Sequence, residues 1–266
     1  GLFFLNGLMV GSWAPKLPVL MQRLDISEAV AGGIVLVLGL GSITIMPVFG
    51  ALTARRGSAR AVRLAALLAV PTLLLISVSP NLIATMATVF LFGGMIGAMD
   101  VAMNANAVAV ERGRRRAIMS SCHGFWSLGG VVGAGFGGMA ITLLGEVWHA
   151  VAVTLLLAAG LAVILPRVLQ DAPVAEGATA APLRLPRQPL PYVIGFMALC
   201  CMVPEGAILD WAAVYLQREM GASLSLAGWG FAGCAATMAV MRFLGDALRH
   251  RLGAVSMLRL SALVAI

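Results

Sequence analysis

The sequence has 266 residues, of which 61% are hydrophobic and only 11% are charged, and its mean hydropathy is +0.98. Soluble domains average about 25% charged residues, so this composition excludes a protein whose whole surface faces water. The formal net charge of +7 lies in short arginine clusters between apolar runs, which indicates membrane topology and not a surface for nucleic acid.

Apolar runs of about 20 residues, enough for a helix to cross about 30 Å of hydrocarbon, follow one another along the chain. They predict six spans, near residues 1–21, 29–53, 63–79, 82–110, 117–143 and 147–165. Further spans are predicted near 191–217 and 223–244, and a last one begins near 254. The alternation typical of barrel strands is absent, so the sequence predicts an all-α polytopic membrane protein.

The stretch between the sixth and seventh spans is rich in Pro and Ala and lacks apolar periodicity. We therefore expect a six-helix bundle over 1–165, a cytoplasmic linker over 166–190, and the first, incomplete part of a second bundle over 191–266.

Arginines alternate between the loops, and this alternation predicts the orientation of the chain. The rich loops are those after spans 2, 4, 6 and 8, and they hold Arg55, Arg56, Arg60, Arg63, Arg112, Arg114, Arg115, Arg116, Arg167, Arg184, Arg187, Arg249 and Arg251. The other loops hold little beyond Arg23 and Arg218. By the positive-inside rule the rich loops and the N-terminus are cytoplasmic, as expected of a multi-pass protein in a bacterial inner membrane.

Two stretches of the chain resemble each other at an offset of 198 residues, and a shorter motif repeats at nearly the same offset. "SWAPKLPVLMQRLDISEAVAGG" from Ser12 matches "DWAAVYLQREMGASLSLAGWG" from Asp210, and "ARRG" ending at Gly57 matches "HRLG" ending at Gly253. Six spans separate the copies, so both halves have the same orientation and form a parallel repeat.

This repeat resembles the major facilitator superfamily, whose fold is two related six-helix bundles. Its loop 2–3 signature is matched in "GALTARRGSAR", although Ala54 stands where the family has an acid. In the second copy His250 takes that place, with Asp246 nearby as a substitute, so the family's latch between loops is in doubt. The resemblance assigns a gating role to Gly50, Arg55, Arg56, Gly57, Arg60, Asp246, Arg251 and Gly253.

Four segments resemble the bacterial MosC-like branch of this superfamily more narrowly: "GSWAPKLPVL", "MDVAMNANAVAVE", "SCHGFWSLGG" and "EGAILDWAAVYL". The namesake is linked to an inositol-like compound. The resemblance implies a monomeric transporter of twelve helices, of which this sequence ends in the ninth. Its partners would be a small solute, protons and the lipid bilayer, with no nucleic acid, cofactor or metal.

Charged residues inside a span cost roughly 2.5–3.5 kcal/mol at the bilayer centre, so those present are functional candidates. In the fourth span Asp100, Asn104 and Glu111 share one stripe, while Asn106 points elsewhere. His123 lies at a similar depth in the fifth span, with Trp126 on its face. We predict proton coupling at Asp100 and solute contacts at Asn104, His123 and Trp126. A buried structural pair of Asp100 and His123 is the alternative, and Glu111 is expected to neutralise the neighbouring arginines.

The seventh span carries Glu205 and Asp210, five residues apart. Five residues turn a helix through about 140°, so both acids share a face only if the helix breaks, and Pro204 predicts such a break. We expect both acids to take part in proton coupling, with Glu205 nearer the middle of the membrane.

In the first span Asn6 and Trp13 share a face, and the repeat pairs Trp13 with Trp211. Flat indole rings suit the rings of sugars or cyclitols, so all three are predicted to contact solute. An aromatic anchor at the outer interface is the alternative for the tryptophans. Lys16, the single lysine of the sequence, is expected to extend outward to the interface or to pair with an acid of the seventh span.

The sequence thus predicts a secondary active transporter, not an enzyme, for a small polar, sugar- or cyclitol-like solute coupled to protons. The glycines of "GGVVGAGFGG" allow two interpretations: close helix packing, or the motif of proton antiporters, in which Ala134 replaces its proline. The alternatives are therefore a proton antiporter that exports an amphiphilic metabolite or drug, and a membrane sensor or scaffold that transports nothing.

Overall fold

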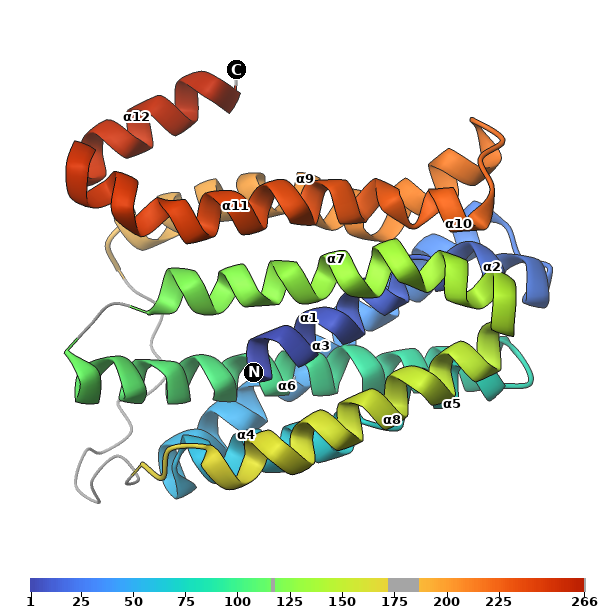
Figure 1. The fold of residues 1–266 in the computed structure, drawn as a ribbon, viewed down its shortest axis with the longest axis horizontal. Helices are drawn as coiled ribbons and strands as arrows, with labels where there is room; N and C mark the ends of the chain where they lie inside the picture. The colour runs from blue at the N-terminus through green and yellow to red at the C-terminus, as the bar shows by residue number, and fades with distance from the viewer. Residues whose placement is uncertain (116–117, 172–186, 266) are drawn as a thin grey trace.

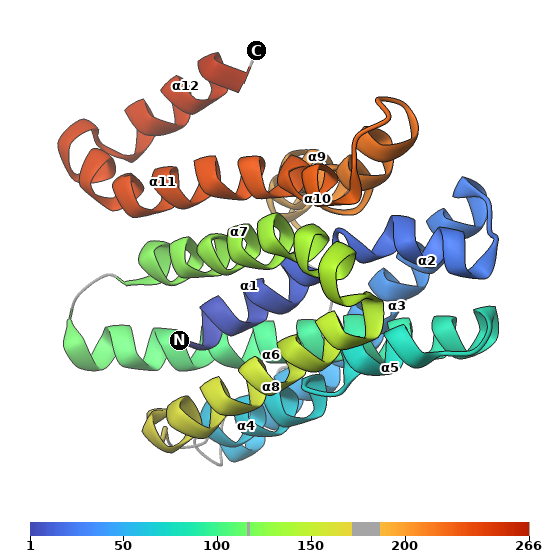
Figure 2. The same cartoon turned by 45° about the vertical axis from the view of Figure 1, so that its right-hand side comes forward.

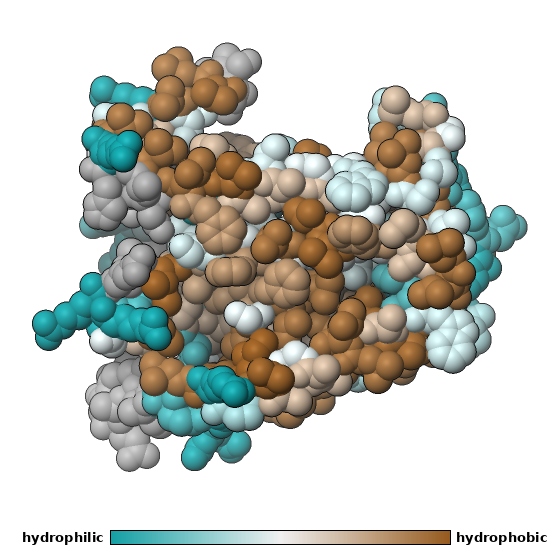
Figure 3. Space-filling model, in the orientation of Figure 1, coloured by the Kyte–Doolittle hydropathy of each residue, from teal (hydrophilic) through white to brown (hydrophobic). Residues whose placement is uncertain are grey.

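The computed structural model of the chain describes residues 1–115, 118–171 and 187–265. All the regular elements among these residues are helical, and the long helices lie side by side (Figure 1). Seven helical segments of the described chain are long and apolar enough to cross a membrane. Hydrophobic side chains fill the middle of the visible face, and hydrophilic ones gather mainly at its two ends (Figure 3). The predicted all-α polytopic fold is confirmed.

The helices of the first part follow the six predicted spans. They are α1 (Leu2–Trp13), α2 (Lys16–Leu24), α3 (Glu28–Arg56), α4 (Ser58–Ala69), α5 (Thr72–Val78), α6 (Leu82–Arg114), α7 (Met119–Leu144), α8 (Glu146–Ile164) and the short 3-10 helix η1 (Leu165–Arg167). The second part contains α9 (Leu190–Arg218), α10 (Leu224–Ala227), α11 (Trp229–Leu252) and α12 (Ala254–Ala265). The eighth predicted span differs most, because α11 continues to Leu252 and does not end near 244.

Prolines interrupt some of these helices and not others. Pro15 separates α1 from α2, and Pro71 separates α4 from α5. The predicted break at Pro204 is wrong, because α9 runs through this residue without interruption. A proline removes a single backbone hydrogen bond, while the apolar surroundings favour every other bond of the helix. Glu205 and Asp210 accordingly lie at different angles on one continuous helix.

Glycines allow the helices of the first part to approach closely. A Cβ atom on Gly93 of α6 would lie 2.1 Å from the carbonyl oxygen of Leu38 in α3. One on Gly7 of α1 would lie 1.9 Å from the carbonyl oxygen of Trp126 in α7. Such distances leave no room for a side chain, so α3 packs on α6 and α1 on α7 with their backbones nearly touching. Most of the buried apolar side chains form one core, which is built mainly by helices α1 to α8.

Helix α11 packs along α7, and this contact joins the two parts of the chain (Figures 1 and 2). A smaller apolar cluster of Ala14, Ala134, Phe231, Ala232 and Ala235 lies there. By contrast, residues 190–204 of α9 are all exposed. The division into 1–165, 166–190 and 191–266 stays a prediction, and most of its linker, 172–186, lies outside the described residues.

The long helices define two ends of the molecule. At the arginine-rich end, on the left of Figure 1, α3 and α6 finish and α4 and α7 begin. At the opposite end lie α2 and α10.

Candidate functional site

Asp100 and His123, predicted to lie near each other, are connected through an amide. Asn104 Nδ2 donates to Asp100 Oδ1 at 3.1 Å, and His123 Nε2 lies 3.1 Å from Asn104 Oδ1. Because an amide oxygen can only accept, Nε2 is the donor in this contact. The ring of Phe3 packs against the imidazole in a T-shaped arrangement, with ring centroids 5.1 Å apart. The pair is therefore a chain of three polar groups from α6 to α7.

Asn6 and Trp126 also meet in this region, although they come from different spans. The indole Nε1 of Trp126 donates to Asn6 Oδ1 at 2.8 Å, and Asn6 Nδ2 donates to the carbonyl of Ile96 at 3.3 Å. The amide thus joins α1, α6 and α7. Trp13, expected on the same face of the first span, has a different partner, and the predicted contact of Asn6 with solute stays a prediction.

Arg242 of α11 completes the region and was missed by the sequence analysis. Its Nη1 donates to Ser127 Oγ at 2.6 Å and to the carbonyl of His123 at 3.4 Å. Its guanidinium carbon lies 5.7 Å from the centroid of the Trp126 ring, and its Nη2 lies 3.7 Å from Glu205 Oε1 of α9. We call Arg242, Glu205, His123, Trp126 and Ser127 the Arg242 cluster.

The sequence does contain a signal for Arg242, the same one that marks the acids of the spans. Charges inside apolar spans are rare and functional, and Arg242 falls inside the predicted span 223–244. It lies two residues before the end of that predicted span, where the basic loop begins, so it resembles an interfacial arginine.

Helices α1 and α9 are also in contact, toward the opposite end of the molecule. Trp13 Nε1 donates to Asp210 Oδ1 at 3.0 Å. The indole is 1% exposed and packs on Phe92, with ring centroids 5.9 Å apart. Trp13 is enclosed in this structure, and its predicted contact with solute stays a prediction.

Trp211 is only partly buried and lines a cavity of about 240 Å³ between α3 and α9. An ion pair between Arg218 and Glu28 crosses the same cavity. Together with the hydrogen bond of Trp13, this ion pair holds α9 against the first part of the chain at the opposite end.

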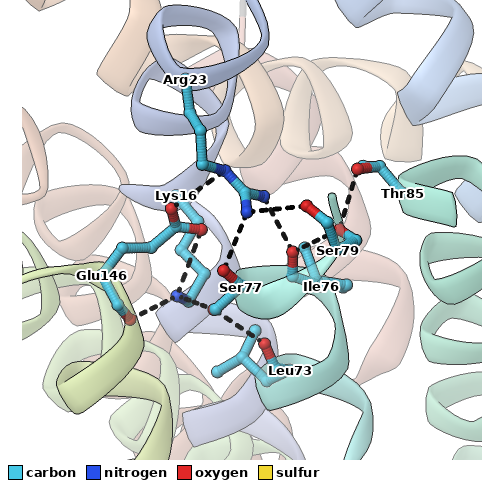
Figure 4. A network of polar contacts seen from close by, with 8 residues as sticks. All are labelled: Lys16, Arg23, Leu73, Ile76, Ser77, Ser79, Thr85 and Glu146. Atoms are coloured by element: carbon cyan, nitrogen blue, oxygen red, sulfur yellow. Dashed lines mark hydrogen bonds and ion pairs between the residues drawn. The ribbon is translucent and has the colours of Figure 1, made fainter. Parts of the chain in front are cut away.

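The prediction for Lys16 is wrong on both counts. Its side chain is fully buried and does not extend to the interface, and its acidic neighbour is Glu146 of α8, not an acid of the seventh span (Figure 4). The Nζ atom donates to Ser77 Oγ at 2.6 Å and to the carbonyl of Glu146 at 3.2 Å, and lies 3.8 Å from the carboxylate. The break at Pro15 starts a new helix whose buried face includes Lys16 and Leu17.

Arg23 extends this arrangement, which we call the Lys16 network: Lys16, Arg23, Ser77 and Glu146 (Figure 4). Its Nε lies 3.3 Å from Glu146 Oε2. Its terminal nitrogens donate to the carbonyls of Ile76, Ser77 and Ser79 at 2.8–3.0 Å. These carbonyls end α5, where a helix leaves its last acceptors without internal partners. The network thus fastens the ends of α2, α5 and α8 together.

Two other polar residues of α6 serve the arginine-rich end. Glu111 was expected to neutralise neighbouring arginines, but its Oε2 accepts from the amides of Ile118 and Met119 at 2.8 and 3.2 Å, which caps α7. Asn106 points away from Asp100, as predicted, and donates to Ser58 Oγ and to the carbonyl of Leu169, both at 2.9 Å.

A carboxylate does reach loop 2–3, although Ala54 replaces the family's acid. Asp171, which follows η1, accepts from the amides of Ser58 and Ala59 at 2.9 and 3.0 Å. Burial alone raises the pKa of Asp171, but these amide hydrogen bonds outweigh it and hold the pKa below its ordinary value. Gly57 has a φ of +83°, and a Cβ there would lie 2.7 Å from the backbone oxygen of Asp171. The glycine of the signature therefore makes room for the chain that follows the sixth span.

The second copy of the loop shares this backbone feature, since Gly253 has a φ of +78°. Arg251 lies exposed at the end of α11, whereas Arg116, Arg184 and the side chains of Asp246, Arg249 and His250 lie outside the described residues. The roles of Gly50, Arg55, Arg56, Gly57, Arg60, Asp246, Arg251 and Gly253 in gating stay predictions.

The glycines of α7 contact other helices closely. A Cβ on Gly129 would lie 2.1 Å from the carbonyl oxygen of Phe4, and one on Gly138 would lie 2.3 Å from that of Leu224. The interpretation as close packing therefore holds for these two positions.

Comparison with known proteins agrees with this architecture. The sequence model described as "Major Facilitator Superfamily" matches residues 1–266. The uncharacterised transporter y4wD of Sinorhizobium fredii is 34% identical over 99% of this chain and 70% of its own length. An uncharacterised MFS-type transporter of Yersinia pestis is 37% identical over 94% of this chain and 65% of its length. The membrane protein MosC of Rhizobium meliloti is 28% identical over 99% and 64%.

The crystal structure of the nucleoside transporter NupG has the same fold, with a TM-score of 0.65 at 14% identity, over 96% of this chain and 67% of NupG. The chain spans about two thirds of the length of all four proteins. MosC is among the proteins that this chain matches, in agreement with the predicted resemblance. This chain belongs to the major facilitator superfamily.

Proposed function

We propose that the protein is a secondary active transporter that moves a small polar, sugar- or cyclitol-like solute together with protons by alternating access. The observation that carries the proposal is the set of polar contacts that links α6 and α7 to α9 and α11. It begins at Asp100, passes through Asn104 and His123, and ends at the Arg242–Glu205 pair. Both predicted bundles contribute to it, as alternating access requires of a central site.

The carboxylates of Asp100 and Glu205 are the proposed proton carriers. An ionised carboxylate inside a membrane span is costly, and a proton removes that cost. A proton bound on one side and released on the other therefore couples its own movement to that of the solute. Asp210, which accepts the hydrogen bond of Trp13, is the third candidate.

The groups around this site suit a polyhydroxylated ring. Asn6, Asn104 and His123 offer donors and acceptors for hydroxyl groups, and Trp126 offers an aromatic face. Trp13 and Trp211 would contact the solute only once α9 has moved away from the first part of the chain.

We further propose that the arginine-rich end faces the cytoplasm of a bacterium and that the N-terminus lies on this side. The opposite end is then external. It is held shut by the hydrogen bond from Trp13 to Asp210 and the ion pair of Glu28 with Arg218. With these two contacts formed, the arrangement matches a state closed to the outside.

The test is solute-driven proton movement by the full-length protein in liposomes that contain a pH-sensitive dye. Sugars, cyclitols and amphiphilic cations are added in turn to wild type and to Asp100→Asn. Acidification of the lumen with a polar solute, lost in Asp100→Asn, is the expected result. Asp25→Asn is the matched control, because Asp25 is exposed outside the site and its left-handed φ of +50° suits asparagine. Proton movement with cations from an acidic lumen, or none with any solute, would contradict the proposal.

A further inference from the structure

The guanidinium of Arg242 is held on one edge and left open on the other. Among the described residues, its hydrogen-bond acceptors are Ser127 Oγ and the carbonyl of His123, and both bind Nη1. At 3.7 Å, Nη2 and Glu205 Oε1 form an ion pair that is too long for a hydrogen bond. Guanidinium groups carry five N–H donors in a planar fork that matches a carboxylate. The fork of Arg242 therefore has donors left for a ligand.

The plane and accessibility of the fork are also set by its surroundings. Trp126 lies against the guanidinium, 5.7 Å from centroid to carbon, and restricts its orientation. The side chains of Arg242 and Glu205 are 28% and 31% exposed, so the helices of this chain do not enclose them. A guanidinium needed only as a helix tie would be expected to form short contacts with its carboxylate.

The charged groups around Arg242 have a net charge of −1, which the uptake of one proton neutralises. The titratable groups that face Arg242 and Glu205 are His123 of α7 and Cys234 of α11, and Asp100 of α6 faces His123 in turn. With both carboxylates ionised, His123 neutral and Cys234 a thiol, one positive and two negative charges sum to −1. An anion is repelled by this sum until a carboxylate has taken up a proton.

We propose that Arg242 recognises a carboxylate of the solute in place of Glu205, so that the transported molecule is a small polyhydroxylated acid that binds together with a proton. This inference rests on the proposed transport function and specifies its substrate class. Glu205 takes a proton from water and becomes a neutral acid, which releases Arg242. The solute carboxylate then occupies the fork, and both steps reverse when the solute leaves. An amine would be repelled by Arg242, and a neutral sugar has no use for its charge.

The experiment measures binding by the full-length protein in nanodiscs, through the shift of its melting temperature with ligand concentration. The probes are sugar acids and hydroxy acids, among them D-glucuronate and D-gluconate, each with its neutral parent, and D-glucosamine as a cation. We expect at least one acid to bind, with an affinity that rises about tenfold per pH unit between pH 8 and pH 6, as uptake of one proton requires. Its neutral parent should bind at least tenfold more weakly.

Three variants separate recognition from a structural role. Arg242→Gln should lose at least tenfold in affinity for the acid and leave the affinity for the neutral parent unchanged. Glu205→Gln should bind the acid tightly at pH 8 and no longer respond to pH, a gain that loss of a helix tie would not produce. Arg187→Gln is the matched control, because Arg187 is exposed in the segment before α9 and its loss removes the same charge outside the site.

Binding of neutral sugars or glucosamine but not of acids would overturn this inference, and so would an unchanged pH response in Glu205→Gln. Failure of every acid to bind to folded protein would overturn it as well. If a neutral sugar then drives protons into liposomes, the proposed transport function stands without its acidic substrate. If no solute of any charge drives protons, that function fails too.

Discussion

The Lys16 network and the Arg242 cluster use the same kinds of charged group in opposite ways. In the network Lys16 is fully buried, the Glu146 side chain is 10% exposed, and Lys16 and Arg23 form hydrogen bonds of 2.6–3.2 Å. In the cluster both partners are about 30% exposed and stand 3.7 Å apart. The network lies within the first six predicted spans, whereas the cluster joins α7 to α9 and α11.

This difference indicates which charges hold the fold and which are free to change partners. A buried ion with short hydrogen bonds is costly to separate, so the helices that it joins move as one body. A loose, accessible pair contributes little to stability, and therefore exchanges its partner at little cost. Helices that must separate during transport are better joined by the second kind of contact.

The largest expected effect comes from removal of the negative charge of the network. Glu146→Gln leaves Lys16 and Arg23 without a nearby carboxylate, and a buried ion without its partner costs about 3–5 kcal/mol of stability. We expect a clear fall in the melting temperature of the protein in detergent. The double variant Lys16→Met/Glu146→Gln should recover part of the loss, because no buried lysine charge remains. Equal stability of Glu146→Gln and wild type would show that the network is not what holds these helices.

A smaller loss is expected when Lys16 keeps its carboxylate but loses its shortest hydrogen bond. Ser77→Ala removes the oxygen that lies 2.6 Å from Nζ and leaves a buried donor unsatisfied. The expected cost is about 1–3 kcal/mol, again measured by thermal unfolding. Thr88→Ala on α6 is a suitable control, since the Thr88 hydroxyl bonds only to carbonyls of its own helix. Matching losses in both variants would mean that the contact with Lys16 adds nothing.

The spans and their order could be predicted from the sequence because hydrophobic length and arginine position are local properties. The environment of Lys16, after Pro15, could not be predicted from the sequence. Only the packed structure shows that α2 turns Lys16 toward α5 and α8. Glu146 comes 130 residues later, at the first turn of α8. Nothing in its local sequence marks it as the partner of a lysine.

The site was predictable where its members share one helix or lie at one depth. Asp100 and Asn104 are one turn apart, and His123 was placed at the same level, so their meeting could be expected. Arg242 and Glu205 meet only because α11 packs on both α7 and α9, and this depends on tertiary packing. The break expected at Pro204 failed for a related reason, because backbone hydrogen bonds inside a membrane outweigh the loss of a single one.

At the cluster, stability should change little while function is lost. Glu205→Gln removes a long, partly exposed ion pair, which is worth about 0–1 kcal/mol. The melting temperature should stay within a few degrees of wild type, and solute-driven proton uptake in liposomes should disappear. A loss of stability as large as that of Glu146→Gln would erase the distinction between the two regions.

Asp171 allows the effect of hydrogen-bond length to be separated from that of burial. It combines short hydrogen bonds, like those of the network, with a position near the surface. Its carboxylate accepts from two amides at the start of α4, at 2.9 and 3.0 Å. Asp171→Asn keeps one acceptor oxygen but removes the charge that favours this helix end. With solvent screening, the expected loss is about 0.5 kcal/mol, toward the low end of measured helix caps.

The contribution of Asp171 to stability should depend on pH, and the direction of this dependence follows from its pKa. The pKa of Asp171 is held below its ordinary value, since the amides of Ser58 and Ala59 bind the ionised form and outweigh the opposing effect of burial. A group whose folded pKa is lowered stabilises the fold above its unfolded pKa, near 4, and this contribution is lost as the pH falls through the folded value. Wild type and Asp171→Asn should therefore differ in melting temperature at pH 7 and converge below pH 4. Convergence shows that short hydrogen bonds stabilise a charge even near the surface, whereas a difference that persists at low pH would assign the effect to shape and not to charge.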